Sequence, residues 1–462
     1  MDNITKSDCV VWKVDPTRNP RNKRKLQTDA KKGIYNQLVK ICEILLKEED
    51  KDKDVKSKDD KPKGDSNVPD LDDNLEADRL RLIRAIRKAI KPILHRIDTT
   101  EMRIKYSDII SNYIKNVRPC LEESVVKQKS KEVKKLVLVD NNATPTVIFD
   151  KQIGSESAVG VAYMNMGKRF ANLLKFSCKL MSVSKDNTNE TKILKEMSEI
   201  VIRGITPNMP LTYNILECKN KCTLPLCPKV AQKKYYVVMS ELANCDIQTW
   251  LKETHTEMEY CSVIAQLLIA VDTFHKMGYI HRDTHLGNFL IHKIKPGGYW
   301  HYQENKGFED INIYIPNTGY LLVLWDPGLA MKTKGMSDRE IAHYQKYDLM
   351  RPLRLMMAIA TYPMYIEMKL KRVPDKVYKM ITIMNDKIKQ GYNTTSVISQ
   401  TLNYPEFNDL PHGIKVANDF FGEKVTKSLI INDKPYSLND INLKEIREND
   451  KKVAKKAAKN KK

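Results

Sequence analysis

The spacing of apolar residues divides the chain into parts with different predicted secondary structure. Helical spacing over residues 82–90 and again over 109–117 predicts two helices, the second of which ends before Pro119. From residue 135 the apolar residues form short strand-like runs, and farther along the chain long helical patterns replace them. A sheet-rich part followed by a helical part predicts an α+β fold.

Charged residues mark a boundary in the first hundred positions. Between Lys47 and Asp65, 15 of 19 residues are charged, so this segment cannot bury enough apolar surface to fold. We therefore predict a small unit at 1–46, a charged linker at 47–75, a helical spacer at 76–134, a main domain at 135–440 and a basic tail at 441–462.

Composition narrows the function classes. The 462 residues allow two or three domains, and 41% hydrophobic with 30% charged residues excludes a wholly disordered, collagen-like or coiled-coil chain. Because no apolar stretch could span a bilayer or act as a signal peptide, we expect a soluble intracellular protein with no membrane partner. The net charge of +21 is concentrated in residues 13–40 and 451–462, so nucleic acid or an acidic partner would bind the ends.

The nine cysteines are widely scattered, which favours a reducing compartment over a disulfide framework. Cys218, Cys222 and Cys227 lie close together but lack paired C-x-x-C spacing, so they do not predict a zinc site. We expect these three residues to be free thiols on an insertion.

Two sequence motifs contain candidate catalytic and metal-binding residues. Residues 279–291, Tyr-Ile-His-Arg-Asp-Thr-His-Leu-Gly-Asn-Phe-Leu-Ile, follow an apolar helical pattern and place Asp283 five residues before Asn288. Residues 321–330, Leu-Leu-Val-Leu-Trp-Asp-Pro-Gly-Leu-Ala, form a buried strand pattern that ends at Asp326.

The two motifs, in this order after a sheet-rich part, resemble the H-R-D-x-x-x-x-N and D-F-G motifs of the protein kinases. The resemblance implies a bilobal protein-kinase-like fold over residues 135–440, with a β-rich N-lobe and a helical C-lobe. It also implies ATP and Mg²⁺ as cofactors, with Mn²⁺ as the alternative metal. Asp283 would orient the hydroxyl, and Asn288 and Asp326 would bind the metal.

Residues 151–163 resemble the Gly-rich loop that covers the phosphates in kinases. Gly154 fills the first glycine position and Gly160 fills the last with one extra residue, whereas Glu156 stands at the middle one. The resemblance therefore assigns Gly154 and Gly160 to nucleotide binding.

Lys179 lies in a strand pattern that resembles the one carrying the V-A-I-K lysine of kinases. The resemblance implies that Lys179 contacts the α- and β-phosphates and contributes to catalysis. Its carboxylate partner would come from a helix over 191–203, where Glu196 fits best and Glu199 is the alternative.

Residues 235–251 read as a buried strand, a polar connector and a helix start, which resembles the adenine-binding hinge of kinases. By this resemblance the backbone of Glu241 to Ala243 would bind adenine and Ser240 would border the pocket. Asp246 would lie near the ribose.

Several positions depart from the protein-kinase pattern. His285 replaces the lysine usual two residues after the catalytic Asp, a form that also occurs in small-molecule phosphotransferases such as the aminoglycoside and choline kinases. We expect His285 to approach the γ-phosphate and to act as an imidazolium, so that transfer rises as pH falls from about 8 towards 6.5. Asp348 resembles the buried Asp of the helix after the activation segment, no A-P-E follows Asp326, and residues 299–317 leave room for an insertion.

The first 46 residues carry a second resemblance. Cys9-Val-Val-Trp12, a Pro- and Asn-rich turn, Gly33-Ile34-Tyr35 and Cys42 follow the order found in the two-cysteine adaptor domain of large nucleocytoplasmic DNA viruses. In those viruses it is fused to divergent kinases of this type, which implies an iridovirus- or mimivirus-like protein and an adaptor-mediated partner. The expected location is the host cytoplasm, at the viral factory, or the virion, with the nucleus open through the basic tail.

Together these features predict an enzyme that transfers phosphate from ATP to Ser or Thr hydroxyls of proteins, with the substrate unidentified. Two alternatives stay open. A small-molecule kinase of the same superfold is favoured by His285, and a pseudokinase scaffold is favoured by the incomplete Gly-rich loop and by Pro327.

Overall fold

The computed structural model describes residues 100–128, 131–153, 159–164, 175–306, 309–362, 370–402, 415–416, 430–432, 434–449 and 452. The chain divides into two units, Met1–Asn74 and Leu75–Lys462, and every described residue belongs to the second. The adaptor resemblance with Cys9 and Cys42, the charged linker, the predicted helix over 82–90, Gly154 and, in the basic tail, residues 450, 451 and 453–462 lie outside the described residues.

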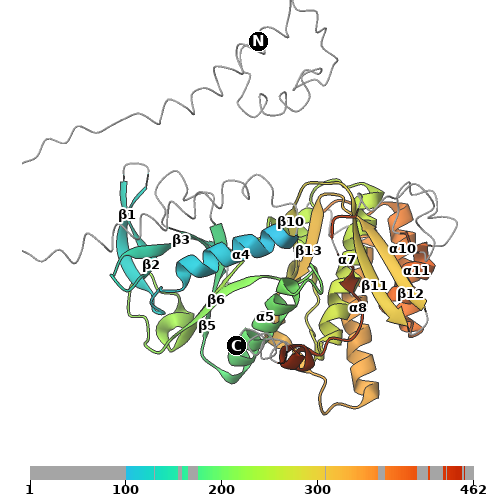
Figure 1. Cartoon of the computed structure of the whole chain (residues 1–462). Coiled ribbons are helices and arrows are strands. Elements are labelled where there is room, and N and C mark those ends of the chain that lie inside the picture. Colours follow the sequence, from blue (N-terminus) through green and yellow to red (C-terminus); the bar gives the residue numbers. More distant parts are fainter. Residues whose placement is uncertain are drawn as a thin grey trace, which may run out of the picture. The chain divides into compact units, whose positions relative to one another are not determined.

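One large antiparallel sheet fills the first part of the described chain (Figure 1). Its strands pair in the order β1-β2-β3-β4-β5-β7-β6. They are β1 (Glu122–Gln128), β2 (Lys131–Val139), β3 (Pro145–Ile153), β4 (Val159–Met164), β5 (Lys175–Ser182), β6 (Thr212–Cys218) and β7 (Tyr235–Ser240). Helix α5 (Lys185–Ile202) connects β5 to β6, so the last two strands in space are reversed relative to the sequence.

The second part is built around α7 (Glu257–Lys276), whose residues are almost all buried because both of its faces are packed. Four more helices belong to this part: α6 (Ile247–Trp250), α8 (Asp338–Thr361), α10 (Asp375–Lys389) and α11 (Thr394–Leu402). The structure also has three short 3₁₀ helices, η2 (Lys229–Gln232), η3 (Leu286–Asn288) and η4 (Pro327–Leu329), and residues 443–449 are helical as well. No described helix is long and apolar enough to cross a membrane.

Small sheets join the connecting segments of this second part. Strand β10 (Phe289–Lys293) lies between β13 (Tyr320–Leu324) and β8 (Cys245–Asp246), and β9 (Tyr279–Ile280) pairs with β14 (Met331–Lys332). The expected insertion is a hairpin of β11 (Tyr299–Lys306) and β12 (Glu309–Pro316), which is extended by β15 (Lys415–Val416) and β16 (Tyr436–Ser437). The chain is therefore α+β, which is compatible with a kinase-like fold.

The predicted helical spacer is only partly helical. Helix α4 (Thr100–Ile114) overlaps the second predicted helix at residues 109–114 and ends before residue 117, whereas β1 and the first residues of β2 are strands that extend the large sheet. The two strands were not predicted from the sequence because charged residues flank the few valines of β1 and of the first half of β2. These residues hide the alternation of apolar and polar positions that is expected of a strand. The boundary predicted at residue 135 falls inside β2.

Helix α4 packs beside β6 (Figure 1), and one of its charged residues is buried against the segments that precede β6 and follow β7. Arg103 is 3% exposed. Its guanidinium donates to both oxygens of the Glu241 carboxylate, at 2.5 and 3.1 Å, and to the carbonyl oxygens of Pro207 and Met209. Because a buried charge is costly unless it is paired, this four-bond arrangement ties α4 to the segment after β7.

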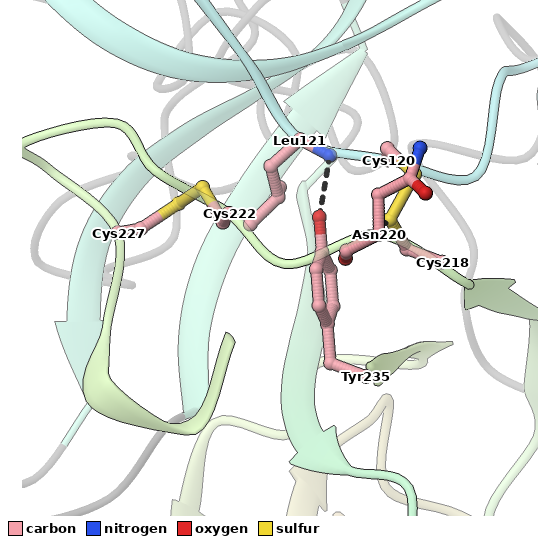
Figure 2. Close-up of a disulfide and its surroundings, with 7 residues drawn as sticks. All are labelled: Cys120, Leu121, Cys218, Asn220, Cys222, Cys227 and Tyr235. Atoms are coloured by element: carbon pink, nitrogen blue, oxygen red, sulfur yellow. Dashed lines mark hydrogen bonds between the residues drawn. A yellow bond between two sulfur atoms is a disulfide. The ribbon is translucent and has the colours of Figure 1, made fainter. Parts of the chain in front are cut away.

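The expectation of free thiols is wrong for Cys218, Cys222 and Cys227. Two disulfides link Cys120 to Cys218 and Cys222 to Cys227. Figure 2 shows how the first tethers the segment after α4 to the end of β6, beside the hydrogen bond from the Leu121 N–H to the Tyr235 hydroxyl. The first pair was hidden in the sequence because its two cysteines are 98 residues apart and come together only through the fold.

Candidate active site

The 281–288 loop runs from β9 to β10 and is held by the buried imidazole of His281. One ring nitrogen, Nε2, lies 2.9 Å from the carbonyl oxygen of Trp325, and the other, Nδ1, accepts the N–H of Asp283 at 3.3 Å. Burial lowers the pKa of His281, although the nearby Asp348 carboxylate opposes that shift. A neutral His281 therefore connects this loop to the segment that carries Asp326.

Asp348 of α8 fixes the backbone of the same loop. Its fully buried carboxylate accepts the N–H groups of His281 at 2.7 Å and Arg282 at 2.8 Å, and it lies 3.1 Å from Nε2 of His275. The burial predicted for Asp348 is confirmed. These bonds hold Arg282 at a φ of 68°, a backbone region that non-glycine residues rarely adopt.

The carboxylate of Asp283 lines a cavity that is also lined by Lys179 of the large sheet and by Asp326. Oδ1 lies 2.7 Å from Nη1 of Arg351, and Oδ2 lies 3.3 Å from the amide nitrogen of Asn288 and 3.5 Å from Nε2 of His285. The Asn288 amide nitrogen also donates to the Asp283 carbonyl oxygen at 2.8 Å. The Asn288 amide is therefore oriented with its nitrogen towards Asp283 and its oxygen away from it.

Asp326 follows β13 and has a left-handed backbone, with a φ of 55°. Pairing of β10 with β13, continued by the bond from the Trp325 N–H to the Asn288 carbonyl at 2.8 Å, brings Asp326 next to the 281–288 loop. Two of the three non-glycine residues with positive φ in the described chain, Arg282 and Asp326, thus lie at this site. Backbone strain of this kind is concentrated at functional sites.

Lys179 of β5 joins the large sheet to this site. Its ammonium is 2.7 Å from Glu190 Oε1 and 2.7 Å from Asp326 Oδ1. Burial alone would lower the pKa of Lys179, but the two carboxylates raise it, and the ammonium in turn lowers the pKa of Asp326 against the effect of burial. Burial raises the pKa of Glu190 in spite of its partner. Lys179, Glu190, Asp283 and Asp326 line one cavity of about 330 Å³.

The prediction that Glu196 pairs with Lys179 is wrong. Helix α5 begins at Lys185, not at residue 191, so Glu190 lies in its second turn and faces β5. Glu196 is six residues farther along, about 9 Å of helix rise, and accepts the Tyr279 hydroxyl at 2.7 Å instead. Glu199, the alternative, binds Arg203 and Arg447. The signal for the earlier start was Ser184, whose side chain caps the helix.

The backbone of Glu241, which the sequence assigned to adenine, makes hydrogen bonds within the fold. Its N–H donates to the Leu211 carbonyl at 2.9 Å and its own carbonyl oxygen lies 3.1 Å from the Ser177 hydroxyl, which is also 3.1 Å from the Ser240 carbonyl. Its carboxylate, whose pKa Arg103 and His292 hold below the usual range despite burial, also accepts the Leu211 N–H. The Glu241 side chain therefore has a structural role, and adenine binding by the backbone of Glu241 and Ala243 stays a prediction.

Three other predicted residues have local roles in the described fold. Asp246 caps α6 by accepting the Thr249 N–H at 2.7 Å. Gly160 lies in β4, where a Cβ atom would approach the Lys151 carbonyl oxygen to 2.9 Å, so close strand packing already requires glycine. His285 accepts the Gly287 N–H on Nδ1 at 3.1 Å. Their contacts to a nucleotide stay predictions.

The site offers one carboxylate, on Asp326, and one amide oxygen, on Asn288, to a metal ion. The described residues contain no group of three or more His, Cys, Asp or Glu side chains that could hold a metal by themselves. Such an oxygen-only and incomplete ligand set fits Mg²⁺, which keeps waters and takes further ligands from substrate phosphates.

Burial of His281 predicts a pH dependence of stability. Its folded pKa lies below the ordinary 6.5, so between these two values the unfolded chain binds more protons than the folded chain. We expect this contribution to stability to be complete above about pH 7 and to decline as pH falls below 6.5. Urea unfolding of the wild type and His281→Asn from pH 5 to 8 checks this, with the exposed His343→Gln as the control. Equal slopes for wild type and His281→Asn would contradict it.

Comparison with known proteins shows a partial similarity to a viral protein. No protein-family model matches the chain. Over 148 residues the chain is 31% identical to a Frog virus 3 (isolate Goorha) protein named "Putative serine/threonine-protein kinase 019R". The match covers 32% of this chain and 17% of that protein, so it spans about one sixth of the relative's length. This similarity suggests a kinase-like viral protein.

Proposed function

We propose that the chain transfers the γ-phosphoryl group of ATP to Ser or Thr hydroxyls of proteins. The observation that carries the proposal is the position of the Lys179 ammonium, at 2.7 Å from both Glu190 and Asp326, in the same cavity as Asp283. A lysine poised between two carboxylates, beside an Asp on a fixed loop, is the set of groups that phosphoryl transfer by kinases requires.

The topology supports a bilobal kinase-like arrangement for the proposal. Within the large sheet, β3 to β7 pair in the order β3-β4-β5-β7-β6, with Lys179 on the middle strand and α5 inserted directly after it. The lysine and its glutamate thus come from the sheet-rich part, whereas Asp283, Asn288 and Asp326 come from the helical part. A reaction site between two such parts would hold the nucleotide on one side and the acceptor on the other.

In the proposed reaction, Lys179 binds the nucleotide phosphates and Asp283 orients the acceptor hydroxyl. The hydroxyl oxygen forms a bond to the γ-phosphorus, and the bond from this phosphorus to the β,γ-bridging oxygen breaks. The hydroxyl proton passes to the Asp283 carboxylate, and ADP leaves. A Mg²⁺ ion held by Asp326 and Asn288 would neutralise charge on the phosphates.

The protein acceptor is favoured by the name of the Frog virus 3 relative, which describes a serine/threonine-protein kinase. A small-molecule acceptor is the second candidate, because His285 replaces the lysine of protein kinases. We also propose a protein partner for the first 46 residues, nucleic-acid affinity for the basic tail, and a viral-factory, virion or nuclear location.

Incubation of the full chain with γ-labelled ATP, Mg²⁺ and a generic basic protein tests the proposal. We expect label on the chain itself or on the added protein, recovered as phosphoserine or phosphothreonine after hydrolysis. In a parallel incubation with small hydroxyl compounds, label on those compounds alone would favour a small-molecule kinase. No transfer to any acceptor, together with retained nucleotide binding, would favour a scaffold.

The pairing of Lys179 with Glu190, and not with Glu196, leads to a separate prediction. Glu190→Gln removes one carboxylate from Lys179, so the ammonium shifts towards Asp326 and transfer is expected to fall about 10²-fold, as for a group displaced by about 1 Å. Glu196→Gln, on the same helix, is the matched control and should leave the rate within a few-fold of the wild type. Initial rates of phosphate transfer decide between them, and the reverse ranking would contradict the assignment.

A further inference from the structure

Arg351 is a positive charge at the candidate active site that the sequence motifs did not indicate. It lies on α8, and its Nη1 atom is 2.7 Å from Oδ1 of Asp283 and 3.4 Å from the carbonyl oxygen of Arg282. The side chains of Arg351 and Asp283 are 29% and 27% exposed, so the ion pair is sheltered from most of the solvent. A partly buried pair of this kind is screened less by salt than a surface pair.

Helix α8 contacts the 281–288 loop with two residues that lie one helical turn apart. Asp348 accepts the backbone N–H groups of His281 and Arg282, and Arg351, three residues later, reaches the next side chain of the loop, Asp283. Residues three apart share a helix face, so both contacts are made from the same side of α8. The helix therefore fixes the backbone of the loop and the carboxylate of Asp283 together.

His285, at the position where protein kinases have a lysine, also lies beside the Asp283 carboxylate. Its Nδ1 atom accepts the N–H of Gly287 at 3.1 Å, and its Nε2 atom is 3.5 Å from Oδ2 of Asp283. A Cβ atom at position 287 would stand 2.9 Å from the ring, which shows how closely Gly287 and the imidazole pack. The imidazole is therefore held by the backbone of its own loop, whereas Arg351 makes the shorter contact with Asp283, at 2.7 Å.

We propose that Arg351 is a positioning residue for phosphoryl transfer and acts through Asp283. By binding Oδ1, Arg351 leaves Oδ2 to accept the proton of the acceptor hydroxyl. A guanidinium stays charged at all physiological pH values, so it supplies a permanent positive charge beside Asp283, near the position where protein kinases have a lysine and this chain has His285. This inference rests on the proposed kinase function and names the residue that replaces the missing lysine.

Arg351→Gln is expected to lower kcat for phosphate transfer about 10- to 100-fold, with KM for ATP unchanged within a factor of about two. Arg351→Lys should keep most of the rate, because an ammonium can still pair with Asp283. Arg354→Gln is the matched control: it is one turn farther along α8, is exposed, and should behave as the wild type. Thermal unfolding of each variant separates loss of fold from loss of rate.

A second-site change separates positioning from a merely structural role. His285→Lys in the Arg351→Gln background places a cation two residues after Asp283, and we expect it to restore transfer at least tenfold over Arg351→Gln. A structural role for Arg351 on α8 would give no such rescue, and that result would overturn the inference, as would wild-type kcat for Arg351→Gln. If Asp283→Asn also transfers at the wild-type rate, the proposed function itself fails.

Discussion

Asp283→Asn is expected to lower phosphate transfer about 10²- to 10⁴-fold while leaving the affinity for ATP within a few-fold. The amide keeps the shape of the side chain and its contact with Asn288, but it cannot accept the hydroxyl proton and it loses the ion pair with Arg351. The nucleotide phosphates are assigned to Lys179, which the substitution does not touch. Transfer of label from ATP and equilibrium titration with nucleotide measure the two effects.

Asp310→Asn, which changes an exposed residue of β12, is the matched control for this substitution. It should change neither the rate of phosphate transfer nor the affinity for ATP. If Asp283→Asn transferred phosphate at the wild-type rate, Asp283 would not orient the acceptor hydroxyl. If its affinity for ATP fell in parallel with the rate, Asp283 would contact the nucleotide and not the acceptor.

The second large effect is on stability. Glu241→Gln is expected to lower the free energy of unfolding by about 3–5 kcal/mol, because it leaves the guanidinium of Arg103 buried without a counter-charge. The glutamine oxygen can still accept the Leu211 N–H, so the loss is mainly that of the charge. Urea unfolding of the two proteins at pH 7 gives the difference.

The double variant Arg103→Met, Glu241→Gln provides the control, since it buries neither charge. It should recover at least half of the lost stability. Asp375→Asn, which breaks the exposed pair with Arg372, should shift the unfolding midpoint little. Additive losses in the double variant would show that Arg103 and Glu241 stabilise the fold independently.

Much of the fold and of the site could be predicted from short-range sequence patterns. The strand patterns after residue 135 and the two motifs ending at Asn288 and Asp326 depend on neighbours within about ten positions, so they could be found in the sequence. The structure brings Lys179, Asp283 and Asp326 to one cavity, although their roles stay predictions. Asp348 was also indicated by sequence, because it follows the second motif at a short distance.

The residues that were missed depend on exact helix starts or on distant contacts. Glu190 was missed because a start of α5 six residues too late moved the helix face that meets β5. Arg103 and Arg351 stand 138 and 68 residues from the carboxylates that they bind, and no local spacing connects them. The ion pair of the Glu241 side chain with Arg103 on α4 was missed for the same reason, because the motif around Glu241 gives no sign of a partner so far away in the sequence.

A crystal structure of the full chain with a non-hydrolysable ATP analogue and Mg²⁺ would show directly whether the nucleotide binds at the candidate active site. We expect phosphates at the ammonium of Lys179, a metal ion between Asp326 and the amide oxygen of Asn288, and the γ-phosphate facing the Asp283 carboxylate. An analogue bound elsewhere, or phosphates directed away from Asp283, would contradict the proposed kinase function.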